Sequence, residues 1–305
     1  MDLPESVAAL GERLGGTGQI VPDPQLLTGA DVFASERDRL FMRPWVAVDH
    51  VSRLDANERF FRFDAATRSI LVTRDKSGRL RALRNVCIHA GYPVCEAEDG
   101  AAERLVCPYH GWEFALDGRL LEPDLTARID PARLRLASHP IAVCDGLILV
   151  DLSAPAGGDD PVPPAATASS IPQWLADAEV TERTRYTLNW NWKYALQLVK
   201  SSPHLLFDEP GEAVPAEFGP LSLLLTRSHE AALLRVVPKS AERTDIQLTR
   251  LAARGTAPPI TAAASDRVDR LAEGLRAAGD AAAVARSAEL DRPFFAWYWS
   301  LMSAD

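Results

Sequence analysis

Two short cysteine–histidine pairs constrain this sequence more than any other feature. One residue separates Cys87 from His89, and two residues separate Cys107 from His110. Each pair follows a short apolar run that is typical of a β-strand, so each pair should lie in a loop that a strand positions. Two such loops can converge so that all four side chains face one metal-containing group.

The composition of the two pairs indicates which metal group they bind. Two thiolates and two imidazoles are the ligands of a [2Fe–2S] cluster of the Rieske type, in which the cysteines bind one iron and the histidines bind the other. Gly91 and Gly111 follow the ligands, where a tight turn brings backbone N–H groups close to sulfur. A mononuclear zinc site is the chemical alternative. Zinc pairs are usually separated by roughly two to five residues, so the single residue between Cys87 and His89 favours two irons.

The sequence around the pairs predicts a small antiparallel β domain. Short apolar runs with frequent turn residues extend over residues 45–151. Residues 76–78 and 116–118 have the composition of hairpin turns. A helix should precede the domain over residues 34–42 and end before a proline.

The second half of the chain has a mixed pattern. Residues 154–173 are rich in Pro, Gly, Ala and Ser, which is typical of a linker. Behind it, residues 193–201 predict a short helix, three strand-like runs over residues 221–253 predict a meander, and residues 264–289 have helical spacing. We therefore divide the chain into an N-terminal segment (1–28), a cluster domain (29–153), a linker (154–173) and a second domain (174–305). The fold class is α+β.

Charge and hydropathy patterning exclude two classes of partner. The chain carries 33 basic and 42 acidic residues, a net charge of −9, whereas general nucleic-acid binding needs a basic face. No apolar run reaches the roughly 18–20 residues that a membrane helix requires. The first residues lack the basic start and apolar stretch of a secretory signal, and four cysteines are too few for a disulfide scaffold. We expect a cytoplasmic protein that binds neither nucleic acid nor membrane.

The remaining cysteines and histidines have simpler interpretations. We expect Cys95 and Cys144 to be small buried apolar residues rather than ligands. His50 and His139 lie among strand residues and should be structural, and His229 should be a core residue on an apolar strand.

At these motifs the sequence resembles the Rieske non-haem iron oxygenases, the family of the ring-hydroxylating oxygenase alpha subunits. The similarity to their Rieske domain covers residues 29–152 and is most specific in CPYHGWEF, residues 107–114. Residues 189–204, NWNWKYALQLVKSSPH, resemble the opening of the family's catalytic domain. The resemblance therefore extends to both halves of the chain, although the second half is shorter than the family's usual catalytic domain.

The resemblance implies a fold, an electron donor and an assembly. The second domain should be a helix-grip-like antiparallel sheet that wraps a long helix. Electrons should come from an NAD(P)H-driven reductase or a ferredoxin, and the assembly should be a trimer or a hetero-oligomer with a related oxygenase chain. High-potential Rieske proteins cross-link their two loops with a second cysteine pair, and here Tyr92 and Tyr109 stand at those positions. The reduction potential should therefore lie near the low end of the Rieske range, about −150 mV.

The resemblance also implies a mononuclear iron site, and here the sequence departs from the family. That iron is held by two histidines and one carboxylate. His204 matches the first histidine, but Glu209 stands at the second and Ser201 stands where the family has an aspartate. Asp291 and Asp305 are the candidates for the carboxylate, and our candidate set is His204, Glu209 and Asp305. Because two positions differ, we expect this Fe(II) site to be impaired.

Three functions are compatible with this pattern. The first is a companion subunit that passes electrons from its cluster to a mononuclear iron in a catalytically complete relative. The second is an active non-haem iron monooxygenase or hydroxylase of a small apolar molecule, with a variant ligand set. The third is a structural, non-redox role in which the cluster only stabilises the fold.

Overall fold

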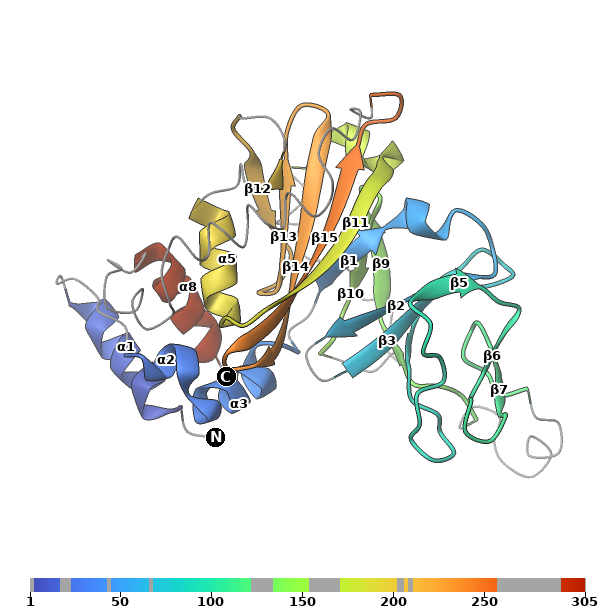
Figure 1. Cartoon of the computed structure of the whole chain (residues 1–305), viewed down its shortest axis with the longest axis horizontal. Coiled ribbons are helices and arrows are strands. Elements are labelled where there is room, and N and C mark those ends of the chain that lie inside the picture. The colour runs from blue at the N-terminus through green and yellow to red at the C-terminus, as the bar shows by residue number, and fades with distance from the viewer. Residues whose placement is uncertain are drawn as a thin grey trace. The chain divides into compact units, whose positions relative to one another are not determined.

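The computed structural model describes residues 3–16, 23–42, 45–65, 68–121, 134–153, 171–201, 206–207, 211–256 and 292–304 (Figure 1). The chain forms two compact units. The cluster unit is Pro44–Val180, and the split unit combines Met1–Arg43 with Thr181–Asp305. The sequence placed the start of the cluster domain at residue 29, whereas in the structure residues up to 43 group with the second half of the chain.

The cluster unit is built from small antiparallel sheets, as the short apolar runs predict. One sheet has the strand order β5-β2-β3-β4-β8, a second has the order β1-β10-β9, and β6 pairs with β7. The strands are β1 (Val46–His50), β2 (Arg59–Ala65), β3 (Arg68–Arg74), β4 (Leu80–Arg84), β5 (Asp99–Ala101), β6 (Arg104–Val106), β7 (Glu113–Ala115), β8 (Ser138–His139), β9 (Ile141–Cys144) and β10 (Leu147–Val150). The described residues of this unit also form the 3₁₀ helices η1 (Val51–Leu54) and η4 (Gln173–Asp177).

Both predicted hairpin turns are present in the cluster unit. Gly78 and Gly118 adopt φ angles of +81° and +89°, a left-handed region that favours glycine. At Gly118, a Cβ atom would also lie 3.0 Å from the Leu83 side chain. The Thr73 hydroxyl donates a 2.6 Å hydrogen bond to the Leu116 carbonyl and so joins β3 to the second turn. This hydrogen bond links β3, the neighbour of β4 in the sheet, to the turn that follows β7.

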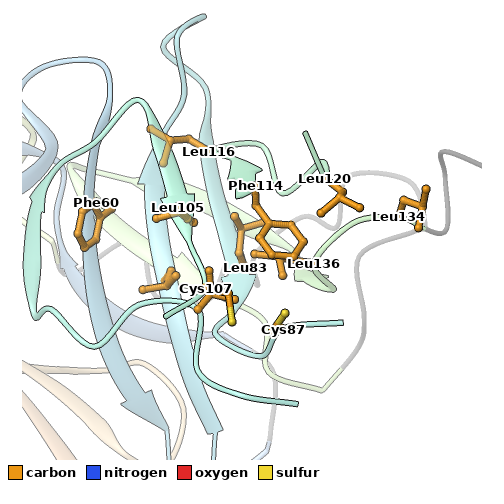
Figure 2. Packing of buried hydrophobic residues seen from close by; sticks show 12 residues of the cluster. Phe60, Leu83, Cys87, Leu105, Cys107, Phe114, Leu116, Leu120, Leu134 and Leu136 are labelled. Carbon is orange, nitrogen blue, oxygen red and sulfur yellow. The ribbon is translucent and has the colours of Figure 1, made fainter. Parts of the chain in front are cut away.

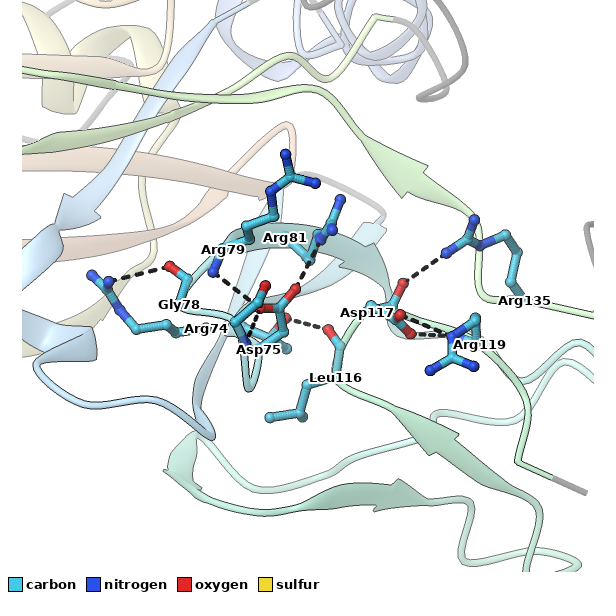
Figure 3. Close-up of polar contacts among 11 residues, drawn as sticks. Arg74, Asp75, Gly78, Arg79, Arg81, Leu116, Asp117, Arg119 and Arg135 are labelled. Carbon is cyan, nitrogen blue, oxygen red and sulfur yellow. Dashed lines mark hydrogen bonds and ion pairs between the residues drawn. The ribbon is translucent and has the colours of Figure 1, made fainter.

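Asp75 holds the turn between β3 and β4 (Figure 3). Its carboxylate accepts hydrogen bonds from the Ser77 hydroxyl at 2.6 Å and from the backbone N–H groups of Ser77 and Arg79 at 2.9 and 3.0 Å. The Arg81 guanidinium lies 3.3 Å from its other oxygen. Burial alone would raise the pKa of Asp75, but these hydrogen bonds outweigh burial and hold the pKa below its ordinary value.

Asp75 should therefore contribute to the acid sensitivity of the cluster unit. A carboxyl group whose pKa is depressed in the folded state stabilises the fold above its unfolded pKa of about 3.9, and that stabilisation is lost as pH falls. The free energy of unfolding of the Asp75→Asn variant should depend less steeply on pH below about 4 than that of the wild type. Urea unfolding at several pH values checks this, and parallel pH profiles for the two proteins would contradict it.

The core of the cluster unit contains both predicted cysteine ligands (Figure 2). Cys87 and Cys107 are 3% and 1% exposed, and they pack with apolar side chains from β2, β3, β4, β6 and β7. Members of this cluster include Phe60, Leu71, Leu83, Leu105, Phe114 and Leu136. The two cysteine side chains are therefore buried in the hydrophobic core of the cluster unit.

The described residues of the split unit form one antiparallel sheet and several helices, which confirms the α+β class. The sheet order is β11-β15-β14-β13-β12. Its strands are β11 (Glu179–Leu188), β12 (Val214–Glu217), β13 (Ser222–Thr226), β14 (Glu230–Ser240) and β15 (Arg243–Ala252), and the helices are α1 (Glu5–Gly15), α2 (Gln25–Thr28), α3 (Ala30–Arg39), α5 (Trp192–Ser201) and α8 (Arg292–Met302). The predicted meander is β13–β14–β15, and the helix predicted at residues 193–201 is α5. The helix predicted at residues 34–42 is α3, which begins and ends earlier. The helical segment predicted at residues 264–289 lies outside the described residues.

A buried ion pair joins three helices of the split unit. Glu36 on α3 is fully buried and forms an ion pair with Lys193 on α5, which is 1% exposed. The same carboxylate accepts hydrogen bonds from the Trp192 indole N–H at 2.7 Å and from the Tyr298 hydroxyl on α8 at 2.8 Å. Burial lowers the pKa of Lys193, and the Glu36 charge opposes that shift. The carboxylate thus connects α3, α5 and α8 through three donors.

Among the described helices, none combines the length and the apolar character that crossing a membrane requires.

Candidate metal centre

The two ligand loops have the same internal hydrogen bonding. In the first, the Cys87 N–H donates to the Tyr92 carbonyl at 2.7 Å, and the Gly91 N–H donates to the Cys87 carbonyl at 2.9 Å. In the second, the Cys107 N–H donates to the Trp112 carbonyl at 2.8 Å, and the Gly111 N–H donates to the Cys107 carbonyl at 2.9 Å. Each loop therefore makes one compact turn that begins at its cysteine.

The two loops require glycine because of the backbone φ angle, and not because a larger side chain would meet a neighbouring atom. Gly91 and Gly111 adopt φ angles of +73° and +74°, and a Cβ atom at either position would meet no atom within 4 Å. A residue with a Cβ is strained at such φ values. The predicted role of both glycines in tight turns is confirmed.

The structure brings the two thiols together. Cys87 and Cys107 belong to the same cluster of buried side chains (Figure 2). Burial raises the pKa of Cys87, the neighbouring Cys107 raises it further, and the backbone N–H groups of His89 and Ala90 partly offset this rise. Two thiolates in one buried place repel each other unless a cation lies between them, so this pair suits a metal ion that binds both sulfurs.

The structure also brings the two imidazoles together. The ring centroids of His89 and His110 lie 4.7 Å apart at an interplanar angle of 62°, and both side chains are exposed. Among the described residues, no group of three or more His, Cys, Asp or Glu side chains is arranged to hold one ion. The four side chains instead form a buried sulfur pair and an exposed nitrogen pair, and this donor set fits a cluster with two different irons.

Aromatic side chains surround the imidazoles, and their contacts with the histidines were not predicted from the sequence. The Trp112 ring stacks on His89 with centroids 4.5 Å apart and planes 7° apart. The ring centroids of Tyr109 and His110 lie 3.8 Å apart, and those of Tyr92 and Tyr109 lie 5.3 Å apart. The sequence does contain one signal for these contacts, because an aromatic residue directly follows each loop glycine: Tyr92 follows Gly91, and Trp112 follows Gly111.

Exposed apolar side chains lie in and next to both ligand loops. Most of the largest exposed apolar side chains of the described residues occur there, at Val86, Ile88, Tyr92, Val106 and Tyr109. Such a concentration near one site is typical of a surface that contacts another molecule.

The candidate mononuclear iron ligands fall where the structure gives no description. His204, Glu209, Asp291 and Asp305 lie outside the described residues, and Ser201 is described only as the last residue of α5. Their roles therefore remain predictions.

The other histidine and cysteine predictions have mixed outcomes. His50 is buried, with its ring nitrogens 2.9 Å from the Ser52 hydroxyl and from the Leu175 carbonyl, and buried His139 contacts a backbone carbonyl, so both are structural. The prediction for His229 was wrong, because this residue is exposed in the turn between β13 and β14. Cys95 and Cys144 are half-buried rather than buried.

Comparison with known proteins identifies part of the chain. Residues 44–139 match the family model of the Rieske [2Fe–2S] domain. The chain is 27% identical over 168 residues to the glycine betaine monooxygenase oxygenase subunit of Pseudomonas aeruginosa, covering 54% of this chain and 39% of that protein. It is 25% identical over 235 residues to choline monooxygenase of Beta vulgaris, covering 74% of this chain and 52% of that protein. The chain thus spans about half or less of these relatives' lengths.

The fold matches solved structures over nearly the whole chain. The apo form of the quaternary ammonium Rieske monooxygenase CntA aligns with a TM-score of 0.75 at 18% identity, covering 99% of this chain and 98% of that chain. Naphthalene 1,2-dioxygenase aligns with a TM-score of 0.60 at 18% identity, covering 85% of this chain and 76% of that chain. The expected α+β class, with a Rieske domain and a second antiparallel sheet accompanied by helices, is therefore confirmed. The long helix expected in the second half is not among the described helices, which have at most 11 residues.

Proposed function

Because this chain contains a Rieske [2Fe–2S] domain and is homologous to the alpha subunits of Rieske oxygenases, we propose that it carries electrons within a Rieske oxygenase system. It accepts them from an NAD(P)H-driven reductase or a ferredoxin. It passes them to a mononuclear iron held by a catalytically complete relative, with which it assembles. The observation that carries this proposal is the gathering of two thiols and two imidazoles in two matching loops.

Each ligand has a distinct role in this proposal. Cys87 and Cys107 hold one iron inside the core, and His89 and His110 hold the other at the surface. The bound cluster supplies one-electron transfer. The buried thiols exclude water from the sulfur side, and the exposed imidazoles give an electron a short path to a docked partner.

The companion role is supported by the sequence of the second half. A facial triad uses two neutral imidazoles and one carboxylate, whereas this chain offers His204 with Glu209. Ser201 also replaces the carboxylate that, in the family, bridges a cluster histidine and an iron histidine across a subunit interface. One of the matched structures is described as giving insight into inter-subunit electron transfer. A chain with a cluster and an impaired iron site can still serve a complete neighbour in such an assembly.

An active oxygenase is the second candidate. The match to choline monooxygenase extends beyond the Rieske domain, and several relatives are named as monooxygenases of choline, glycine betaine or carnitine. In this alternative His204, Glu209 and Asp305 bind Fe(II), and the chain hydroxylates a small molecule. A structural role for the cluster, without redox function, is the third.

Metal analysis and oxygen uptake distinguish these candidates. For the companion role we expect two irons and two acid-labile sulfides per chain. We also expect little substrate-dependent oxygen uptake by the purified chain with ferrous iron, a reductase and NADH. The Ser201→Asp/Glu209→His variant restores the family residues at two positions and should raise iron content toward three per chain. Three irons and rapid coupled turnover by the wild type would instead establish the active oxygenase. A cluster that no reductase reduces would favour the structural role.

A further inference from the structure

The two ligand loops exchange aromatic contacts in a crossed pattern. Because both loops have the same hydrogen bonding, their residues correspond by distance from the cysteine. The second residue after the cysteine is His89 in one loop and Tyr109 in the other. The fifth is Tyr92 in one loop and Trp112 in the other. In both cases, the fifth residue of one loop packs on the second residue of the other.

Both crossed contacts lie beside a predicted ligand. Trp112 stacks on His89 almost in parallel, at 4.5 Å and 7°. Tyr92 packs on Tyr109 at 5.3 Å and 33°, and Tyr109 in turn packs on His110 at 3.8 Å and 38°. One imidazole is therefore held directly by the opposite loop, and the other is held through a tyrosine of its own loop.

We propose that Tyr92, Tyr109 and Trp112 form an aromatic clasp that joins the two loops and positions the imidazole ligands. This inference rests on the proposed assignment of His89 and His110 as ligands. Trp112 fixes the plane of His89. Tyr92 holds Tyr109, which fixes the plane of His110. The clasp links the loops without a covalent bond, at the positions where a cysteine pair links them in high-potential Rieske proteins.

The clasp has a stronger and a weaker side. Trp112 is half-buried and packs against the core cluster that contains both cysteines. Tyr92 and Tyr109 are 42% and 58% exposed, so water reaches much of their contact. Burial strengthens an aromatic contact because it adds hydrophobic stabilisation to the ring geometry. The tyrosine side should therefore open first, and loss of iron should begin at His110.

Removal of one ring from the tyrosine side tests the clasp. The Tyr92→Ala variant should lose its visible cluster absorption in the presence of an iron chelator roughly two- to tenfold faster than the wild type, the factor expected for one aromatic pair. Its electron paramagnetic resonance signal should broaden, because the His110 plane is no longer fixed. The Tyr92→Phe variant keeps the ring and should behave as the wild type. The matched control is Val143→Ala, which shortens a side chain that is 50% exposed on β9.

The outcomes separate the clasp from the ligand assignment. Wild-type protein without a Rieske-type spectrum would disprove the assignment of the ligands. A wild-type cluster with Tyr92→Ala no less stable than Val143→Ala would overturn the clasp alone. Equal defects in Tyr92→Phe and Tyr92→Ala would also overturn it, because the hydroxyl rather than the ring contact would then matter.

Discussion

Replacement of Glu36 by glutamine should lower the free energy of unfolding by about 3–5 kcal/mol, because it leaves a buried charge without its partner. Lys193 is 1% exposed and forms its ion pair with Glu36. The Glu36 charge also raises the pKa of Lys193 against the effect of burial. Without that charge, the free-energy cost of a protonated lysine inside the split unit is larger. Urea unfolding at neutral pH measures the loss.

A second variant shows whether the unpaired charge causes this loss. The Glu36→Gln/Lys193→Met protein has no buried charge at the site and keeps one carbonyl acceptor for the Tyr298 hydroxyl. It should recover at least about half of the stability that the single variant loses. The single variant should also become more stable as pH rises toward the ordinary lysine pKa, because the unfolded chain then binds more protons than the folded one. A double variant as unstable as the single one would show that the lost hydrogen bonds matter more than the charge.

Replacement of Cys107 by serine should remove the [2Fe–2S] cluster. The Cys107 thiol lies beside the Cys87 thiol in the core of the cluster unit, and one remaining thiolate cannot hold the sulfur-bound iron tightly. Because metal binding contributes directly to folding free energy, the variant should also unfold at lower urea concentration. Visible absorption, acid-labile sulfide and urea unfolding measure both effects.

The other two cysteines provide matched controls for this experiment. Cys95 exchanges backbone hydrogen bonds with the Asn85 side chain at 2.7 and 2.9 Å, and the Cys144 thiol lies 3.5 Å from Asp145. Neither belongs to the pair of buried thiols. The Cys95→Ser and Cys144→Ser variants should therefore retain the cluster. Loss of the cluster in either variant, or its retention in Cys107→Ser, would contradict the proposed ligand set.

Local patterns in the sequence predicted the cluster unit well. The turns at Gly78 and Gly118 need φ values that glycine favours, and this requirement is visible in composition alone. The ligand loops were predictable because Cys87–His89 and Cys107–His110 are close pairs whose chemistry depends on spacing. Short-range signals of this kind do not depend on distant parts of the chain.

Long-range contacts were not predictable in the same way. Glu36 appears in the sequence as one charged residue on a polar helix, and nothing nearby indicates its contacts with Lys193 and Tyr298. The aromatic clasp also depends on two loops whose relative position only the fold sets. His229 lies within an apolar run, yet the meander turns at that point and exposes it.

The order in which the chain is made gives the split unit a particular assembly problem. Tyr298 and Glu36 are separated by 262 residues, and the whole cluster unit is inserted between them. On a ribosome, Pro44–Val180 emerges complete while α8 has not yet been synthesised. The buried carboxylate on α3 therefore gains the Tyr298 hydroxyl as a donor only after α8 has been translated. The cluster unit should therefore be able to bind its cluster before the split unit has all the helices that form its core.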